Sequence, residues 1–295
     1  MALALFGRGA QATVTITPTV VAPRNRVRAT AVAHRPIDQV RSARIELGYT
    51  NFYSYRATGR GSAGEDSFPT EPGTDPDERR TSDWVPVDAR ALELRDGKFE
   101  SATADFRVPS WAPPSSSELA RWSCRLILER SGRDVDSGTD LTIVISPDDV
   151  NVQDTPVIRV DGSASLIDIE LDQPVWRAGT VVRGTVAVTP GADLPTADIG
   201  VYLQRIRLSH PLKRMPGGGE EFDGRVTRLD RRAEMRAHRS VRLPFELVLP
   251  PNAAPTASAV HSTLDWYVGA RIFYAGFTGT IPERARRKIY VVNKG

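Results

Sequence analysis

The stretch LPFELVLPPNAAPTASAVHSTLDWYVGARIFY, which runs from Leu243 to Tyr274, decides the fold of this chain. Apolar residues occupy alternate positions in two parts of it, first at Phe245, Leu247 and Leu249 and then at Trp266, Val268, Ala270 and Ile272. Alternation with a period of two is typical of a β-strand with one buried face. Prolines at positions 250, 251 and 255 separate the two parts. The stretch therefore predicts a strand, a proline-rich crossover and a second strand.

The rest of the chain repeats this kind of pattern and has no sustained helical period. Short Val- and Thr-rich or alternating segments recur at spacings of about 8 to 15 residues, with Pro and Gly between them, which is typical of an all-β sandwich. Similar landmarks also recur along the chain. Val27 and Val182 lie 155 positions apart, and Trp122 and Trp266 lie 144 apart. We therefore expect two tandem β-sandwiches built from one repeated unit.

The junction between the two domains is expected near residue 150. Pro147 and Pro156 bracket an acidic run with Asp148, Asp149 and Asp154, which we interpret as a linker. The first domain is then 1–150 and the second 157–295. Residues 58–83 of the first domain contain mainly Gly, Ser, Pro, Asp and Glu, with Phe68 as a rare apolar residue. This insert is predicted to be a flexible loop that adds nothing to the core.

At the opening stretch the chain resembles the arrestin-like fold. The resemblance rests on three features: a strand that begins with an aromatic residue and ends in Leu-Pro, a Pro-Thr pair a few residues later, and a strand of the form Trp-Tyr-Val-x-Ala-x-Ile. The resemblance extends from Ile167 to Tyr274 and includes Ala178-Gly179 and Gly184-Thr185-Val186. It is weaker in the first half of the chain, where Ala22-Pro23-Arg24-Asn25 occupies the position of the family turn. Bacterial sporulation-control proteins are the most similar members; eukaryotic arrestins and the retromer subunit are more distant.

This resemblance implies two tandem arrestin-like β-sandwich domains. It also implies a non-catalytic protein-interaction scaffold or regulator in a bacterium, active in sporulation or in cell-envelope processes. A small-molecule or glycan-binding β-sandwich is the alternative, and an exposed tryptophan beside a polar cleft would favour it. Trp176 is the tryptophan expected to be partly exposed, whereas Trp122 and Trp266 are expected in the two cores.

The composition indicates a soluble cytoplasmic protein. Of 295 residues, 40% are hydrophobic and 25% charged, and the net charge is +3. The apolar run Ala2–Phe6 is too short for a secretory signal, and no segment reaches the roughly 18 apolar residues of a membrane span. The single cysteine, Cys124, lies within an apolar alternation and is expected to be buried. Nothing in the composition indicates specific nucleic-acid binding, and the sequence predicts no oligomeric state.

Catalytic, cofactor and metal sites are not predicted. Gly59–Gly64 matches a dinucleotide fingerprint in letters, but no strand precedes it and no helix follows it. Asp134, Asp136 and Asp140 are interpreted as a solvated turn rather than a calcium site. The four histidines are scattered without ligand spacing, at His34, His210, His238 and His261, and no Gly-x-Ser-x-Gly elbow is present. The chain is therefore not expected to be an enzyme.

The strongest candidate for binding is a run of arginines between Arg225 and Arg242. Only Asp230 and Glu234 offset them, and the predicted partner-binding residues are Arg225, Arg228, Arg231, Arg232, Arg236 and Arg239. Two interpretations remain open: a charged strand edge that discourages aggregation, or a surface that recognises an acidic protein partner or an anionic membrane surface. The pattern fits a strand pair or a short helix, and the basic residues Arg284, Arg286, Arg287 and Lys288 extend the surface in the second interpretation.

Overall fold

The computed structural model describes residues 12–56, 78–131, 134–162, 164–210, 218–276 and 282–293. Its regular structure is β-strand throughout these ranges, apart from a short 3₁₀ turn, η1 (Pro147–Asp149). The predicted all-β class is confirmed. The described chain forms two compact units. Unit 1 ends at Ile145 and also includes Ala259–Ser262, and unit 2 begins at Ser146 and contains the other described residues.

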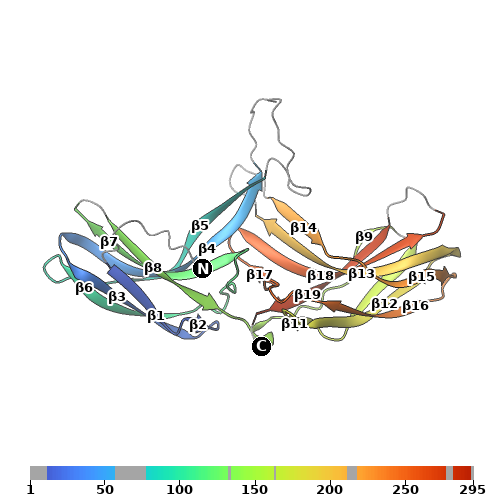
Figure 1. The fold of residues 1–295 in the computed structure, drawn as a ribbon, viewed down its shortest axis with the longest axis horizontal. Coiled ribbons are helices and arrows are strands. Elements are labelled where there is room, and N and C mark those ends of the chain that lie inside the picture. Colours follow the sequence, from blue (N-terminus) through green and yellow to red (C-terminus); the bar gives the residue numbers. More distant parts are fainter. Residues whose placement is uncertain are drawn as a thin grey trace, which may run out of the picture. The chain divides into compact units, whose positions relative to one another are not determined.

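Unit 1 consists of a small and a large sheet, drawn as two layers in Figure 1. The small sheet has the antiparallel order β1 (Ala12–Thr17), β3 (Arg26–Ile37) and β6 (Phe99–Arg107). The large sheet has the order β2 (Val20–Val21), β8 (Val135–Ile143), β7 (Ala120–Arg130), β4 (Val40–Arg56) and β5 (Glu78–Ala91). The short β2 is parallel to β8, and the other neighbours are antiparallel.

Unit 2 has the same plan. Its small sheet has the order β10 (Ser165–Leu171), β12 (Val181–Pro190) and β16 (Val241–Val248). Its large sheet has the order β11 (Val175–Arg177), β19 (Glu283–Val292), β18 (Ser262–Tyr274), β13 (Leu194–Ser209) and β14 (Gly219–Asp223). Three further strands join this sheet at its margins: β15 (Thr227–Met235) on β13, β17 (Ala257–Ser258) on β18, and β9 (Ile158–Asp161) on β19.

The internal repeat predicted from the landmarks is visible in hydrogen bonds as well as in strand order. The indole N–H of Trp122 donates to the carbonyl of Pro113 at 2.7 Å, and that of Trp266 donates to Ala254 at 2.8 Å. The turn before β3 and the turn before β12 each contain a left-handed residue, Arg24 with φ of 69° and Gly179 with φ of 81°. Arg24 thus adopts in unit 1 the conformation for which unit 2 uses glycine.

The two alternating parts of the opening stretch form β16 and β18, as predicted, and the crossover between them also contains the short strand β17. The alternating apolar side chains are buried, and so are Trp122, Trp266 and Cys124. Trp176 is also buried, at 5% exposure, so the expectation of a partly exposed side chain was wrong. Its strand β11 pairs with β19 in the large sheet, where Trp176 lies opposite the buried Val291, and this pairing is invisible in the local sequence.

Two expectations for unit 1 need correction. The predicted loop 58–83 ends too late, because β5 begins at Glu78 and Asp83 lies opposite Asn51 of β4. Polar residues suit this position because β5 is an edge strand of the large sheet. Residues 58–77, with the Gly59–Gly64 motif, lie outside the described residues. Asp136 and Asp140 are likewise not in a turn but in β8, where they alternate with buried residues.

Candidate functional site

The predicted arginine run is a strand, not a helix. Residues 227–235 form β15, which pairs with β13 and, among the described strands, with no other. Ala233 and Met235 are buried and fasten β15 to the core of unit 2. The six predicted arginines lie on β15 or within four residues of it, and all of them are exposed. We call this set, Arg225, Arg228, Arg231, Arg232, Arg236 and Arg239, the arginine surface.

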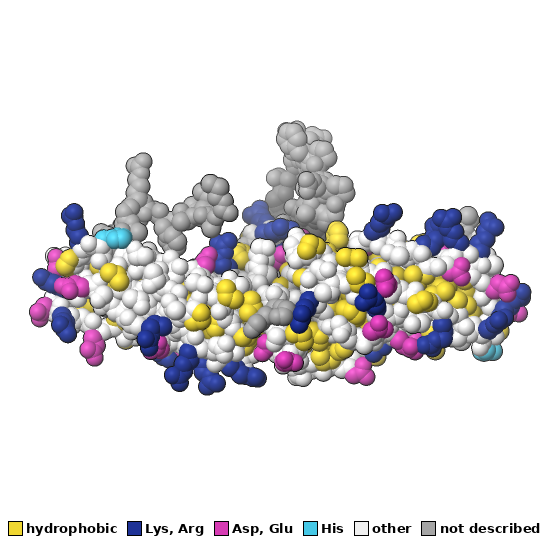
Figure 2. Space-filling view, turned by 60° about the horizontal axis from the view of Figure 1, so that its bottom comes forward, with side chains coloured by type: hydrophobic (Ala, Val, Ile, Leu, Met, Phe, Trp, Pro, Cys, Tyr) yellow, Lys and Arg dark blue, Asp and Glu magenta, His cyan; other side chains and the backbone are white. Residues whose placement is uncertain are grey.

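Four of these six guanidinium groups have no ion pair among the described residues. Arg228 lies 3.6 Å from the carboxylate of Asp198, and Arg236 lies 3.8 Å from Glu234. Side-chain partners are absent, within the same described ranges, for Arg225, Arg231, Arg232 and Arg239. Figure 2 shows Lys and Arg side chains projecting from the right-hand end, where Figure 1 places β15. The arginine surface thus carries positive charge that the described residues of unit 2 do not neutralise.

The backbone of β15 is poorly suited to accept an added strand. Its register with β13 shifts at three places between Leu194 and Gly200, and Arg232 has a φ of 57°. Bulges and charged side chains on an edge twist the donors and acceptors away from an incoming strand. A partner of this surface would therefore contact the guanidinium groups rather than extend the sheet. Guanidinium groups favour carboxylates and phosphates, with which they form paired hydrogen bonds.

The basic residues of β19 do not extend the arginine surface, contrary to that part of the expectation. The Nε of Arg284 donates to Asp161 at 2.6 Å, and the Nζ of Lys288 lies 2.7 Å from Asp265. Arg286 donates to Gln204 at 3.0 Å. These side chains are largely covered and are engaged within unit 2, because their strand lies inside the large sheet rather than at its margin.

The other polar candidates do not converge on a reactive centre in the described part of the chain. His34 contacts Thr13, and the ring of His261 packs at a tilt against that of Tyr53. No group of three or more His, Cys, Asp or Glu is arranged there to hold a metal ion. Burial raises the pKa of the Cys124 thiol to about 12, so the thiol remains protonated and unreactive at neutral pH. Within the described ranges no helix has the length and hydrophobicity to cross a membrane.

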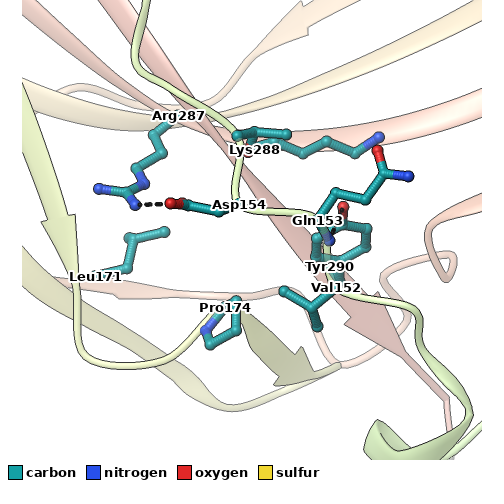
Figure 3. A pocket seen from close by; sticks show the side chains of 9 residues that line it. Val152, Gln153, Asp154, Leu171, Pro174, Arg287, Lys288 and Tyr290 are labelled. Atoms are coloured by element: carbon teal, nitrogen blue, oxygen red, sulfur yellow. Dashed lines mark hydrogen bonds and ion pairs between the residues drawn. The ribbon is translucent and has the colours of Figure 1, made fainter.

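The structure also contains a pocket that the sequence interpretation missed. It has a volume of about 320 Å³ and lies in unit 2 between residues 152–155 and β19 (Figure 3). The predicted linker carboxylate Asp154 lies there beside Arg287, which the sequence interpretation assigned to the basic tail. No local motif signals the pocket, since its walls come from segments more than 100 residues apart in sequence.

Comparison with known proteins yields matches among solved structures. No family model and no curated protein matches the chain. Among solved structures, the chain is similar to the crystal structure of Spo0M, sporulation control protein, from Bacillus subtilis, with a TM-score of 0.35 and 18% sequence identity. The match covers 45% of this chain and 51% of the Spo0M chain, and so about half of each. A sporulation-control protein is thus found among its structural matches.

Proposed function

We propose that this chain is a non-catalytic, arrestin-like interaction scaffold or regulator that binds an acidic segment of a protein partner through the arginine surface. One observation supports this proposal above the others. The guanidinium groups of Arg225, Arg231, Arg232 and Arg239 are exposed and pair with no carboxylate among the described residues, and the same run contains only two acids. A strand edge needs few charges to prevent aggregation, so this uncompensated cluster favours recognition of an anion.

The biological role follows from the sequence resemblance. Bacterial sporulation-control proteins regulate sporulation or envelope processes, and we propose a role of that class, in the cytoplasm, for this chain. The glycan-binding alternative receives less support, because Trp176, on which that hypothesis relied, is buried. Trp111 is 60% exposed, but it belongs to unit 1 and does not line the pocket of unit 2.

A fluorescent peptide of eight glutamates tests the proposal by anisotropy. We expect the full chain to bind it and to lose affinity steeply as the salt concentration rises from about 0.05 M to about 0.5 M, because screening shortens the reach of exposed charges. Replacing Arg231, Arg232 and Arg236 with Glu should abolish binding. A matched control reverses three exposed arginines of unit 1, Arg26, Arg35 and Arg121, and should retain it.

Two outcomes would contradict this assignment. If the folded Arg231/Arg232/Arg236 variant binds the peptide with unchanged affinity and salt dependence, the arginine surface is only a solvated edge. If the parent chain binds phosphatidylglycerol vesicles but not the peptide, and the triple variant does not bind the vesicles, the surface recognises an anionic membrane instead of a protein. Circular dichroism of both triple variants must first show that they are folded like the parent chain.

A further inference from the structure

The pocket of unit 2 has a firmly held wall and a lightly held cover. β19 forms the wall, and it is tied to the neighbouring loop because Tyr290 N–H donates to the carbonyl of Pro174 at 2.9 Å. Residues 151–157 form the cover and are mainly exposed. Two contacts to the wall hold the middle of this segment: Gln153 N–H donates to the Tyr290 hydroxyl at 3.3 Å, and Asp154 pairs with Arg287 at 3.3 Å. Both contacts are long, so displacing the middle of the cover costs little, whereas its end is fixed because Ile158, at the start of β9, pairs with Arg286 of β19.

The polar end of the pocket is a pre-oriented guanidinium group. Arg287 Nη1 donates to the carbonyl of Ile169 at 2.7 Å, which fixes the plane of the group, while Nη2 faces Asp154 (Figure 3). The Asp154 side chain is 95% exposed, so water competes strongly for it. An exposed ion pair of this kind contributes about 0 to 1 kcal/mol. A second carboxylate could therefore replace Asp154 on Arg287 at small cost.

Neighbouring groups define the kind of ligand. Lys288 also lines the pocket, but its Nζ pairs with Asp265 at 2.7 Å, so Arg287 is the cation left to bind a ligand. Tyr290 accepts from Gln153 and keeps its hydroxyl hydrogen for a ligand oxygen. Val152, Leu171 and Pro174 form an apolar lining. One cation beside Asp154 suits a singly charged carboxylate better than a doubly charged phosphate.

We propose that this pocket binds a monocarboxylate with a small apolar body. Its carboxylate replaces that of Asp154 on Arg287 and accepts a hydrogen bond from Tyr290, while the apolar body packs against Leu171 and Pro174. A volume of about 320 Å³ is at the lower end of the range for small-molecule pockets and limits the ligand to the size of a capped amino acid or a small aromatic acid. This site is separate from the arginine surface, and its test is independent of the proposed function.

N-acetyl-leucine is a suitable probe, with N-acetyl-leucinamide as its uncharged counterpart. In calorimetric titrations of the full chain we expect the acid to bind in the millimolar range and the amide to bind at least about tenfold more weakly. The decisive variant is Asp154→Asn, which removes the competing carboxylate while leaving an exposed side chain of the same size. It should tighten binding of the acid about two- to fivefold. A residue with only a structural role would not produce this gain.

Two further variants examine the wall. Arg287→Gln should weaken binding of N-acetyl-leucine by at least about tenfold, and Tyr290→Phe by about three- to tenfold. Arg183→Gln, on the small sheet of unit 2, removes an exposed arginine that pairs with Glu246 at 2.9 Å and should leave binding unchanged. If Arg287→Gln fails to fold, Asp154→Asn and Tyr290→Phe still decide the question. Equal binding of acid and amide, no gain in Asp154→Asn, or no binding of the acid at about 20 mM would overturn the proposal.

Discussion

Truncation of Trp266 to alanine tests the assignment of the second core most directly. Trp266 is 5% exposed on β18, and its indole N–H donates to the carbonyl of Ala254 at 2.8 Å. Removing a buried aromatic side chain costs about 3 to 5 kcal/mol, because apolar contacts are lost and a cavity remains. The Ala254 carbonyl also loses its partner, which places the expected cost in the upper part of that range.

The measurement is the free energy of unfolding in urea, followed by circular dichroism. For a unit of about 150 residues, a loss of about 4 kcal/mol corresponds to a fall in melting temperature of roughly 8 to 16 °C. Trp266→Phe separates the two contributions, since it keeps most of the ring volume but loses the N–H donor, and should cost about 1 to 3 kcal/mol.

Trp111 provides the matched control, because it is the same residue type at 60% exposure. Trp111→Ala should change the free energy of unfolding by less than about 0.5 kcal/mol. If Trp266→Ala lowers it by less than about 1 kcal/mol, or by no more than the control does, Trp266 does not anchor a core and the packing of unit 2 described above is wrong.

Three further outcomes follow from the structure. Deletion of residues 58–77 should shift the melting temperature by only a few degrees, whereas deletion of 58–83 removes part of β5 and should lower it by a clearly larger amount in the same calorimetric scan. Burial raises the pKa of Cys124 from an ordinary 9.0 to about 12, so the contribution of the buried thiol to stability is complete below about pH 9 and is lost as the pH rises toward 12. Cys124→Ala should therefore flatten the alkaline decline in the free energy of unfolding, and an unchanged pH profile would contradict this. Gly184→Ala should destabilise unit 2 by about 1 to 3 kcal/mol, because the added Cβ would collide with a backbone oxygen of β10 and the ring of Phe245, and a variant as stable as the parent in urea would show that the sheet yields at this point.

The sequence alone could predict those features of the chain that depend on local interactions. Alternation at Phe245, Leu247 and Leu249 reflects the two faces of a strand, so it predicts β16 and its buried face directly. The spacing of Val27 and Val182 and of Trp122 and Trp266 similarly reflects one topology used twice. These features depend on neighbours along the chain or on composition, and the all-β class and the repeated sandwich follow from them.

The ends of strands and the burial of individual side chains were harder to predict from the sequence. Glu78–Asp83 has a loop-like composition, yet it forms the start of β5 because an edge strand can present polar side chains on both sides. Trp176 stands beside a turn in sequence, and only its pairing with β19 explains its burial. In both cases the deciding contact is with a strand elsewhere in the sequence.

The charged residues show most clearly which features the sequence can predict and which depend on the tertiary structure. Counting arginines located the cluster from Arg225 to Arg239, because an excess of one charge is a property of composition. Counting could not show that the equally basic residues of β19 are neutralised while much of the arginine surface is not. Asp161 and Asp265 reach β19 only when β9 and β18 take their places beside it in the large sheet, and Asp154 meets Arg287 only across the pocket. Charge density is thus set by the order of residues, but its neutralisation depends on which strands become neighbours.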